Sequence, residues 1–121
     1  MIQVRRQARF LLAAIALALL AACAGDVDHL AVREQVGDAR VVLLSTEWCG
    51  YCRRLRGDLA GWGVAYAEFD VEHTDEGRSA YHLVGGRGVP ILLVGDQVVH
   101  GYAPQRAREL ISASGLAAAS D

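Results

Sequence analysis

The hydrophobic pattern of the chain is clearest in the residues after position 40. Residues 41–45, VVLLS, form a continuous apolar run of strand length, which favours a strand buried on both faces of a sheet. The segment that follows Cys52 instead repeats its large apolar residues, Leu55, Leu59 and Trp62, at intervals of four and three. Arginines fall on the opposite face of the predicted helix. This spacing predicts an amphipathic helix that ends at Gly61 or Gly63.

The segments on either side carry weaker local signals. A helical pattern over residues 30–36 ends at Gly37. Residues 64–71, VAYAEFDV, predict a second strand. Thr74, followed by two acidic residues, then predicts the start of a helix that runs to about Val84.

The last part of the domain combines a hairpin with a helix. Residues 89–94 and 97–100 predict two strands joined by a short turn, and Pro104 predicts the first position of a final helix. Helices after the first two strands predict right-handed crossovers and a parallel first pair, while the hairpin adds an antiparallel edge. The predicted fold class is therefore α/β, a four-stranded mixed sheet flanked by helices.

The first residues of the chain predict a targeting signal rather than a folded element. The basic stretch MIQVRRQARF precedes the apolar stretch LLAAIALALLAA, the order found in secretory signals. The run from Phe10 to Ala22 is shorter than the roughly 18 residues that a membrane-spanning helix needs. We therefore predict a lipoprotein-type signal peptide over residues 1–22, a tether with an N-terminal helix over residues 23–39, and one domain over residues 40–121.

The end of the apolar run allows two processing sites. Leu20-Ala21-Ala22-Cys23 resembles the bacterial lipobox, which implies lipidation of Cys23 as the first mature residue. Ala22-Cys23-Ala24 also fits cleavage after Ala24, which would release a soluble secreted protein. Either processing site predicts that the mature domain lies in the oxidising environment of the cell envelope. If the host has two membranes, Ala24 favours a lipid anchor in the outer membrane, facing the periplasm.

Composition and charge narrow the functional classes. The chain has 121 residues and 53% hydrophobic residues, enough for one core. All twelve of its Lys and Arg residues are arginine, and three of them lie in the first nine residues. Removing that segment leaves a mildly acidic body, which argues against nucleic-acid binding. We expect no dimerisation segment, and therefore a monomer.

The main chemical motif is a Cys-x-x-Cys pair within TEWCGYCRRLR, residues 46–56. This spacing places two sulfurs about one helical turn apart, close enough to form a disulfide. The positive end of the helix dipole would stabilise a thiolate at Cys49 and lower its pKa, which makes Cys49 the expected nucleophile. Cys52, one turn inside the helix, would then resolve the mixed disulfide.

Other interpretations of these residues remain open at this stage. The pair could be half of a zinc site, although the four histidines show no paired ligand spacing, so no metal is expected. It could also be a structural disulfide, although so short a loop stabilises a fold only weakly. The arginines that follow are expected on a solvated helix face: Arg53, Arg54 and Arg56.

Taken together, the strand, the Cys-x-x-Cys helix and a later Val89-Pro90 strand start resemble the thioredoxin superfamily over about residues 40–112. Glu47-Trp48-Cys49-Gly50 is similar to the thioredoxin signature, and Gly50-Tyr51 is similar to glutaredoxins and to a periplasmic disulfide isomerase. The compact spacers and the Gly101-Tyr102 step are most similar to glutaredoxin. The resemblance implies a thioredoxin-like, glutaredoxin-like fold.

The resemblance also implies roles for individual residues. Cys49 and Cys52 match the nucleophilic and resolving cysteines, and Pro90 matches a cis-proline that leaves the Val89 backbone free to pair with substrate. Tyr51 would contact substrate or cover the helix start. Trp48 is a candidate substrate contact that is also expected to pack beside the disulfide.

The sequence departs from the patterns of these families at three places. Leu43 stands where thioredoxins carry a buried acid six residues before the first cysteine. Thr46-Glu47 and Ala103-Pro104 stand where glutaredoxins carry a lysine and an acidic pair that contact glutathione. We therefore expect no bound cofactor, with glutathione as a candidate reductant whose contact residues differ.

The expected function is a thiol-disulfide oxidoreductase of the cell envelope that uses a dithiol mechanism. Its expected partners are protein thiols or disulfides and an upstream envelope redox protein, with membrane contact through the lipid anchor only. The alternatives are a non-catalytic thioredoxin-like binding module and a thiol-based copper(I) carrier.

Overall fold

The computed structural model describes residues 3–4, 7 and 26–116. Cys23 and most of the predicted signal segment lie outside these residues. In chain order the elements are α2 (His29–Val36), β1 (Val41–Ser45), α3 (Gly50–Gly61), β2 (Ala67–Asp70), α4 (Asp75–Leu83), β3 (Ile91–Val94), β4 (Gln97–His100) and α5 (Pro104–Ala113). Within the described ranges, no helix combines the length and apolar character that crossing a membrane would require.

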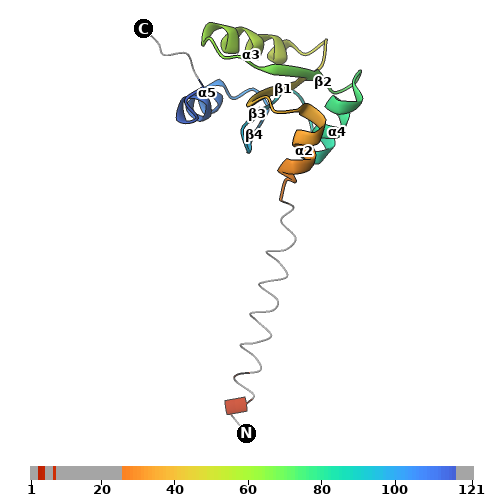
Figure 1. The fold of residues 1–121 in the computed structure, drawn as a ribbon, viewed down its shortest axis with the longest axis vertical. Coiled ribbons are helices and arrows are strands. Elements are labelled where there is room, and N and C mark those ends of the chain that lie inside the picture. The colour runs from red at the N-terminus through yellow and green to blue at the C-terminus, as the bar shows by residue number, and fades with distance from the viewer. Residues whose placement is uncertain (1–2, 5–6, 8–25, 117–121) are drawn as a thin grey trace.

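The four strands form one mixed sheet in the order β2-β1-β3-β4 (Figure 1). Strands β1 and β2 are parallel, and β3 is antiparallel to both β1 and β4. This confirms the predicted fold class, the parallel first pair and the hairpin. Helix α4 connects β2 to β3, which are antiparallel and lie on either side of β1. The right-handed crossover rule holds for parallel strands, so the right-handed connection predicted here does not follow from it.

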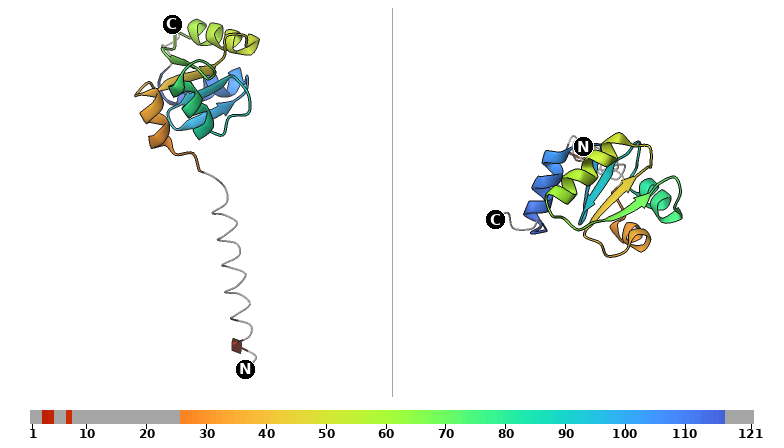
Figure 2. Two further views of the ribbon diagram at one scale, coloured as in Figure 1. Left: turned by 90° about the vertical axis from the view of Figure 1, so that its right-hand side faces the viewer. Right: turned by 90° about the horizontal axis from the view of Figure 1, so that it is seen from above.

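Helices α3 and α5 cover one face of the sheet, and helices α2 and α4 cover the other, as Figure 2 shows. Alternate residues of β1 point to opposite faces, as the pleat requires. Val41 and Leu43 pack in a cluster with residues of α3 and α5, including Leu55, Leu59 and Ile111. Val42 and Leu44 pack in a second cluster with residues of α2 and α4. Helix α2 is thus part of the domain's core. All five residues of β1 are buried, which confirms the prediction for this strand.

Two predicted strands are shorter in the structure, for reasons that lie in their neighbours. Residues 64–66 precede β2 because Val64 belongs to the turn that ends α3: its amide donates to the Leu59 carbonyl at 3.0 Å. That turn places Gly63 at φ 67°, in the left-handed region. Strand β3 begins at Ile91 because Pro90 has no N–H to donate to the sheet.

Helix α4 begins where the sequence predicts and lies close to the end of β2. The Thr74 side chain accepts the Gly77 amide at 3.1 Å and donates to the Asp70 carbonyl at 2.6 Å. A Cβ at Gly77 would overlap this carbonyl oxygen and the Thr74 hydroxyl. The absence of a side chain at Gly77 therefore lets the helix approach the strand.

We expect Gly77→Ala to lower the free energy of unfolding by about 1–3 kcal/mol, because the added methyl group must displace backbone atoms. Gly57→Ala is the matched control: it lies on α3 with open space around it, and should leave stability unchanged or raise it by up to about 1 kcal/mol. Chemical denaturation of both variants measures the difference. Equal effects of the two substitutions would contradict the close approach at Gly77.

Candidate functional site

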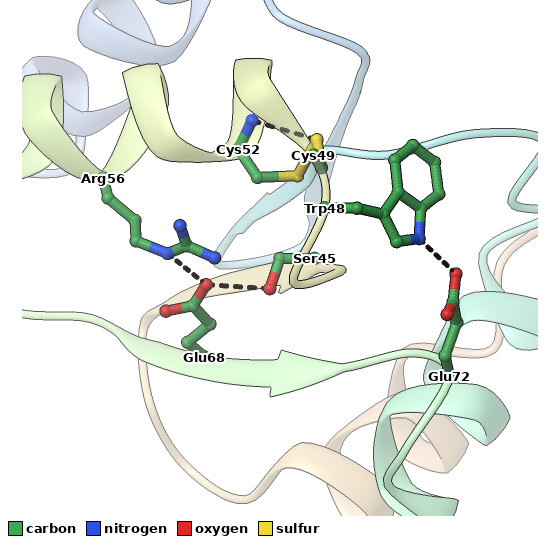
Figure 3. The surroundings of a disulfide bond; sticks show 7 residues. All are labelled: Ser45, Trp48, Cys49, Cys52, Arg56, Glu68 and Glu72. Carbon is green, nitrogen blue, oxygen red and sulfur yellow. Dashed lines mark hydrogen bonds and ion pairs between the residues drawn. A yellow bond between two sulfur atoms is a disulfide. The ribbon is translucent and has the colours of Figure 1, made fainter.

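The two cysteines lie where strand β1 passes into helix α3 (Figure 3). Cys49 is the N-cap residue of α3, and its Sγ accepts a hydrogen bond from the Cys52 amide at 3.0 Å. The two residues form a disulfide, with their Cα atoms 5.2 Å apart. Cys49 is 5% exposed and Cys52 is fully buried. The two sulfurs are thus bonded to each other but differ in access to solvent.

The helix start favours negative charge on one of these sulfurs. After reduction, Cys49 Sγ would remain beside unpaired amides at the positive end of α3, which stabilise a thiolate. The first turn of α3 holds no acidic residue that would oppose this effect. Cys52 lies one turn inside, where burial disfavours its ionised form. The geometry therefore fits attack by Cys49 and resolution by Cys52.

The loop before β3 lies at the same end of the sheet as the cysteines, because Leu44 of β1 pairs with Ile91 of β3. The Val89–Pro90 bond is cis, as the resemblance implies. Pro90 is buried. Within the described part of the chain, neither the amide nor the carbonyl of Val89 has a hydrogen-bond partner. The Val89 backbone is therefore available to a bound segment.

A groove of about 710 Å³ lies beside this loop. Its lining includes Thr46 and Trp48 from the loop after β1, Arg78 and His82 from α4, and Arg87 and Val89 from the loop before β3. Thr46 is 2% exposed, and its hydroxyl is buried without a hydrogen-bond partner in the structure. The groove thus combines an apolar wall, basic side chains and one buried hydroxyl that lacks a hydrogen-bond partner.

Trp48 borders this groove and is held by a polar contact rather than by packing. Its indole Nε1 donates to Glu72 Oε1 at 2.8 Å, as Figure 3 shows. The residue is 69% exposed, so the expected packing beside the disulfide is wrong. The reason is that Glu72, in the loop after β2, supplies an acceptor on the solvent side. Trp48 therefore presents its ring to solvent next to Cys49.

Tyr51 lies on a different surface from Trp48. It is 57% exposed, and its ring stacks on Tyr102 with the centroids 5.4 Å apart. The Tyr102 hydroxyl donates to Asp58 Oδ2 at 2.7 Å, and this hydrogen bond to a carboxylate raises the Tyr102 pKa. The Arg54 guanidinium lies 5.8 Å from the Tyr51 ring centroid. Tyr51 thus partly covers the helix start while keeping an exposed edge.

Of the three arginines after the motif, Arg53 and Arg54 are exposed on the predicted face, but Arg56 is not simply solvated. Arg56 Nε contacts Glu68 Oε1 at 2.6 Å, and the Ser45 hydroxyl donates to the same oxygen at 2.8 Å. Sequence reasoning missed Ser45 and Glu68 as parts of this site. The only signal in the sequence was that Ser45 and Glu68 are each a polar residue within a segment predicted as a strand.

A separate group of polar side chains comes from the loop after β1 and from the end of β2 with the loop that follows it. Ligand atoms of Glu47, Asp70 and His73 all lie within 4.8 Å of one another. His73 Nδ1 is 3.0 Å from Asp70 Oδ2, and this hydrogen bond lowers the Asp70 pKa and raises the His73 pKa. Asp70 Oδ1 also accepts the amides of Glu72 and His73. The Asp70 carboxylate therefore organises the turn after β2.

Taken together, these observations define a thioredoxin-like fold with a cysteine pair at a helix start and a cis-proline loop at the same end of the sheet. Residues 41–99 match the glutaredoxin family model. Two curated sequences named glutaredoxin, from two strains of Mycobacterium tuberculosis, are 43% identical over 47 residues. That match covers 39% of this chain and 52% of theirs, so the chain spans about half the length of the curated relatives it matches.

Solved glutaredoxin structures share the fold. A buckwheat glutaredoxin-glutathione complex superposes with a TM-score of 0.60 at 20% identity, covering 74% of this chain and 92% of that one. A glutaredoxin from Archaeoglobus fulgidus gives 0.56 at 26% identity, covering 64% and 91%. The glutaredoxin-like NrdH-redoxin of Escherichia coli gives 0.54 at 21% identity, covering 59% and 93%. The chain therefore has a thioredoxin-like fold with a glutaredoxin-like domain, and its cysteine pair supports thiol oxidoreductase chemistry.

We expect Asp70→Asn to bring the His73 pKa down toward its ordinary value of 6.5, because the main hydrogen bond from His73 would then lose its charged acceptor. NMR titration of the His73 ring measures this, with the His82 ring as an internal control. A His73 titration unchanged by the substitution would contradict the pairing.

The same pair predicts a pH window for stability. The folded-state pKa of His73 is raised, so its contribution is complete below pH 6.5 and lost as the pH rises through the raised value. The folded-state pKa of Asp70 is lowered, so its contribution is complete above pH 3.8 and lost as the pH falls through the lowered value. The difference in stability between wild type and Asp70→Asn should therefore be largest between these two limits.

Proposed function

We propose that this protein is a thiol-disulfide oxidoreductase of the cell envelope that works by a dithiol mechanism. The observation that carries the proposal is the helix cap: Cys49 Sγ accepts the Cys52 amide at 3.0 Å while Cys52 is fully buried. This arrangement gives two neighbouring sulfurs different chemistry. One is stabilised as a thiolate next to Trp48, which borders the groove, and the other is shielded until the first has reacted.

The proposed cycle transfers two electrons to a substrate disulfide. The Cys49 thiolate attacks one substrate sulfur, the substrate S–S bond breaks, and the second substrate sulfur leaves as a thiolate that takes up a proton. Cys52 then loses its proton and attacks Cys49 Sγ. This forms the internal disulfide seen here and releases the other substrate sulfur as a thiolate. One dithiol donor, which becomes a disulfide, or two molecules of glutathione, which form glutathione disulfide, return the pair to the reduced state by the reverse exchange.

The groove supports an extended protein segment as the substrate. The unpartnered Val89 backbone can pair with such a segment beside Pro90, and the exposed Trp48 ring can cover it. Tyr51 would contact the same substrate from the other side of Cys49. The buckwheat relative is described in complex with glutathione, and the Escherichia coli relative has a thioredoxin-like activity profile. We propose protein disulfides as substrates, with glutathione or an upstream envelope dithiol protein as the reductant.

Substitution of each cysteine tests this function. Cys49→Ser should lower insulin-disulfide reduction to the background rate, because it removes the attacking thiolate. Cys52→Ser should keep the first attack and accumulate mixed disulfides that non-reducing electrophoresis detects, because no thiol remains to resolve them. Cys23→Ser is the matched control and should retain the wild-type rate. Wild-type activity in the Cys49→Ser variant would overturn the proposal.

We further propose that the domain is attached to the outer membrane through a lipid on Cys23 and acts as a monomer. The support is the match of residues 20–23 to a lipobox after an apolar run. In a bacterial host, labelled palmitate should enter the wild-type protein but not Cys23→Ser. Mass spectrometry of a mature protein that begins after Ala24 would instead establish the soluble secreted form.

A further inference from the structure

One residue that the proposed mechanism does not use, Tyr102, contacts two side chains of the helix that starts at the cysteines. Its ring stacks on the Tyr51 ring, with the centroids 5.4 Å apart and the planes at 27°. Its hydroxyl donates to Asp58 Oδ2 at 2.7 Å. Tyr51 and Asp58 share one face of α3, about two turns apart. Tyr102 therefore reaches along this face, from the later part of α3 to a residue that lies between the two cysteines in the sequence.

The segment that carries Tyr102 is itself attached to the loop before β3. The Gly101 amide donates to the Pro90 carbonyl at 2.8 Å. Gly101 has φ 79°, in the left-handed region that glycine adopts most readily. The Tyr102 side chain is half-buried and packs against the hydrophobic cluster on the α3 side of the sheet. Tyr102 is thus fixed on both sides, through its neighbour to the proline loop and through its own side chain to α3.

These contacts restrict the Tyr51 side chain at a place that a substrate can reach. Tyr51 is 57% exposed, and an exposed side chain ordinarily exchanges between rotamers within nanoseconds. Here the Tyr102 ring stacks against it, and the Arg54 guanidinium lies 5.8 Å from its ring centroid. Tyr51 and Arg54, together with Gly50, line an open hollow of about 390 Å³. Since Gly50 directly follows Cys49 in the chain, a part of the substrate that enters this hollow lies close to the attacking residue.

We propose that Tyr102 is a positioning residue that makes the protein prefer polypeptide disulfides over small ones. Anchored on Asp58, it holds the Tyr51 ring as a wall of the substrate site, and it acts through Tyr51 rather than on the sulfurs. The inference rests on the proposed function. A polypeptide that extends beyond its disulfide contacts the Tyr51 ring, which the free protein already orders, so binding costs less conformational entropy. A small disulfide reaches Cys49 without contacting this ring and gains nothing from its order.

Two disulfides of different size separate this positioning role from the chemical step. Reduced full-length protein, in a Cys23→Ser background that removes the third thiol, is mixed with excess insulin or with excess hydroxyethyl disulfide, a small neutral disulfide without rings. Acid quenching, alkylation of the remaining thiols and mass spectrometry then give the rate at which the cysteine pair is oxidised. The ratio of the two second-order rate constants measures the preference for the polypeptide substrate.

We expect Tyr102→Ala to lower the rate constant with insulin about fivefold or more and to leave that with hydroxyethyl disulfide unchanged or higher, because only insulin extends over the Tyr51 ring. Tyr102→Phe keeps the stacked ring but loses the anchor, and should lower the insulin rate constant by a smaller factor. Asp58→Asn keeps an acceptor oxygen for the Tyr102 hydroxyl and should retain the wild-type ratio. Tyr66→Phe is the matched control: Tyr66 packs against the same hydrophobic cluster, and its variant should behave as wild type.

A double-mutant cycle tests whether Tyr102 acts through Tyr51. Tyr51→Ala should lower the insulin rate constant at least as much as Tyr102→Ala, and the double variant should react no more slowly than Tyr51→Ala alone. Independent effects that multiply in the double variant would overturn the inference. An unchanged insulin rate constant in Tyr102→Ala would overturn it as well, as would an equal loss with both disulfides. A wild-type protein that neither disulfide oxidises would instead contradict the proposed function.

Discussion

The hydrogen bond from the Cys52 amide to Cys49 Sγ is the contact on which the rest of the site depends. It makes a cysteine the N-cap of α3, so the helix starts at the reacting sulfur. One residue of the pair then lies beside unpaired amides and the other lies a turn inside the core. Strand β1 makes this possible. It is buried along its whole length, which fixes the position at which the chain leaves the sheet before α3.

Carboxylates from other elements then shape the surroundings of this point. Glu72 holds the Trp48 indole on the groove side, and Asp58 holds Tyr102, on which Tyr51 stacks. Trp48 is therefore fixed at its polar edge and Tyr51 by stacking of its face, while both side chains stay largely exposed. Such rings can cover a bound segment at a small entropic cost, because the free protein already orders them. This arrangement suits the protein substrates that we propose.

The sequence predicted most of the fold because most of its signals are local. The apolar run of β1, the helical spacing of α3 and the Thr74 cap of α4 each act within a few residues, and the structure confirms them. The ends of β2 and β3 were less predictable. They depend on how the turn after α3 uses Val64 and on where the antiparallel register of β3 begins.

The parts of the site that the sequence alone did not predict all involve partners far apart in the chain. Trp48 was expected to pack, yet its partner is Glu72, and Arg56 was expected in solvent, yet its partner is Glu68. The residues next to Trp48 or Arg56 in the sequence do not indicate such a partner. The partner becomes available only when β2 is laid beside β1 in one register.

The sequence by itself therefore determined the elements and the placement of two cysteines at a helix start, because spacing and capping are properties of neighbouring residues. Only the tertiary structure decided which side chains surround those cysteines. Leu43 shows the difference: the position is apolar in the chain, and a carboxylate reaches the same face of the sheet from Glu68 on the adjacent strand. Sheet register, which no single segment encodes, brought that charge to the site.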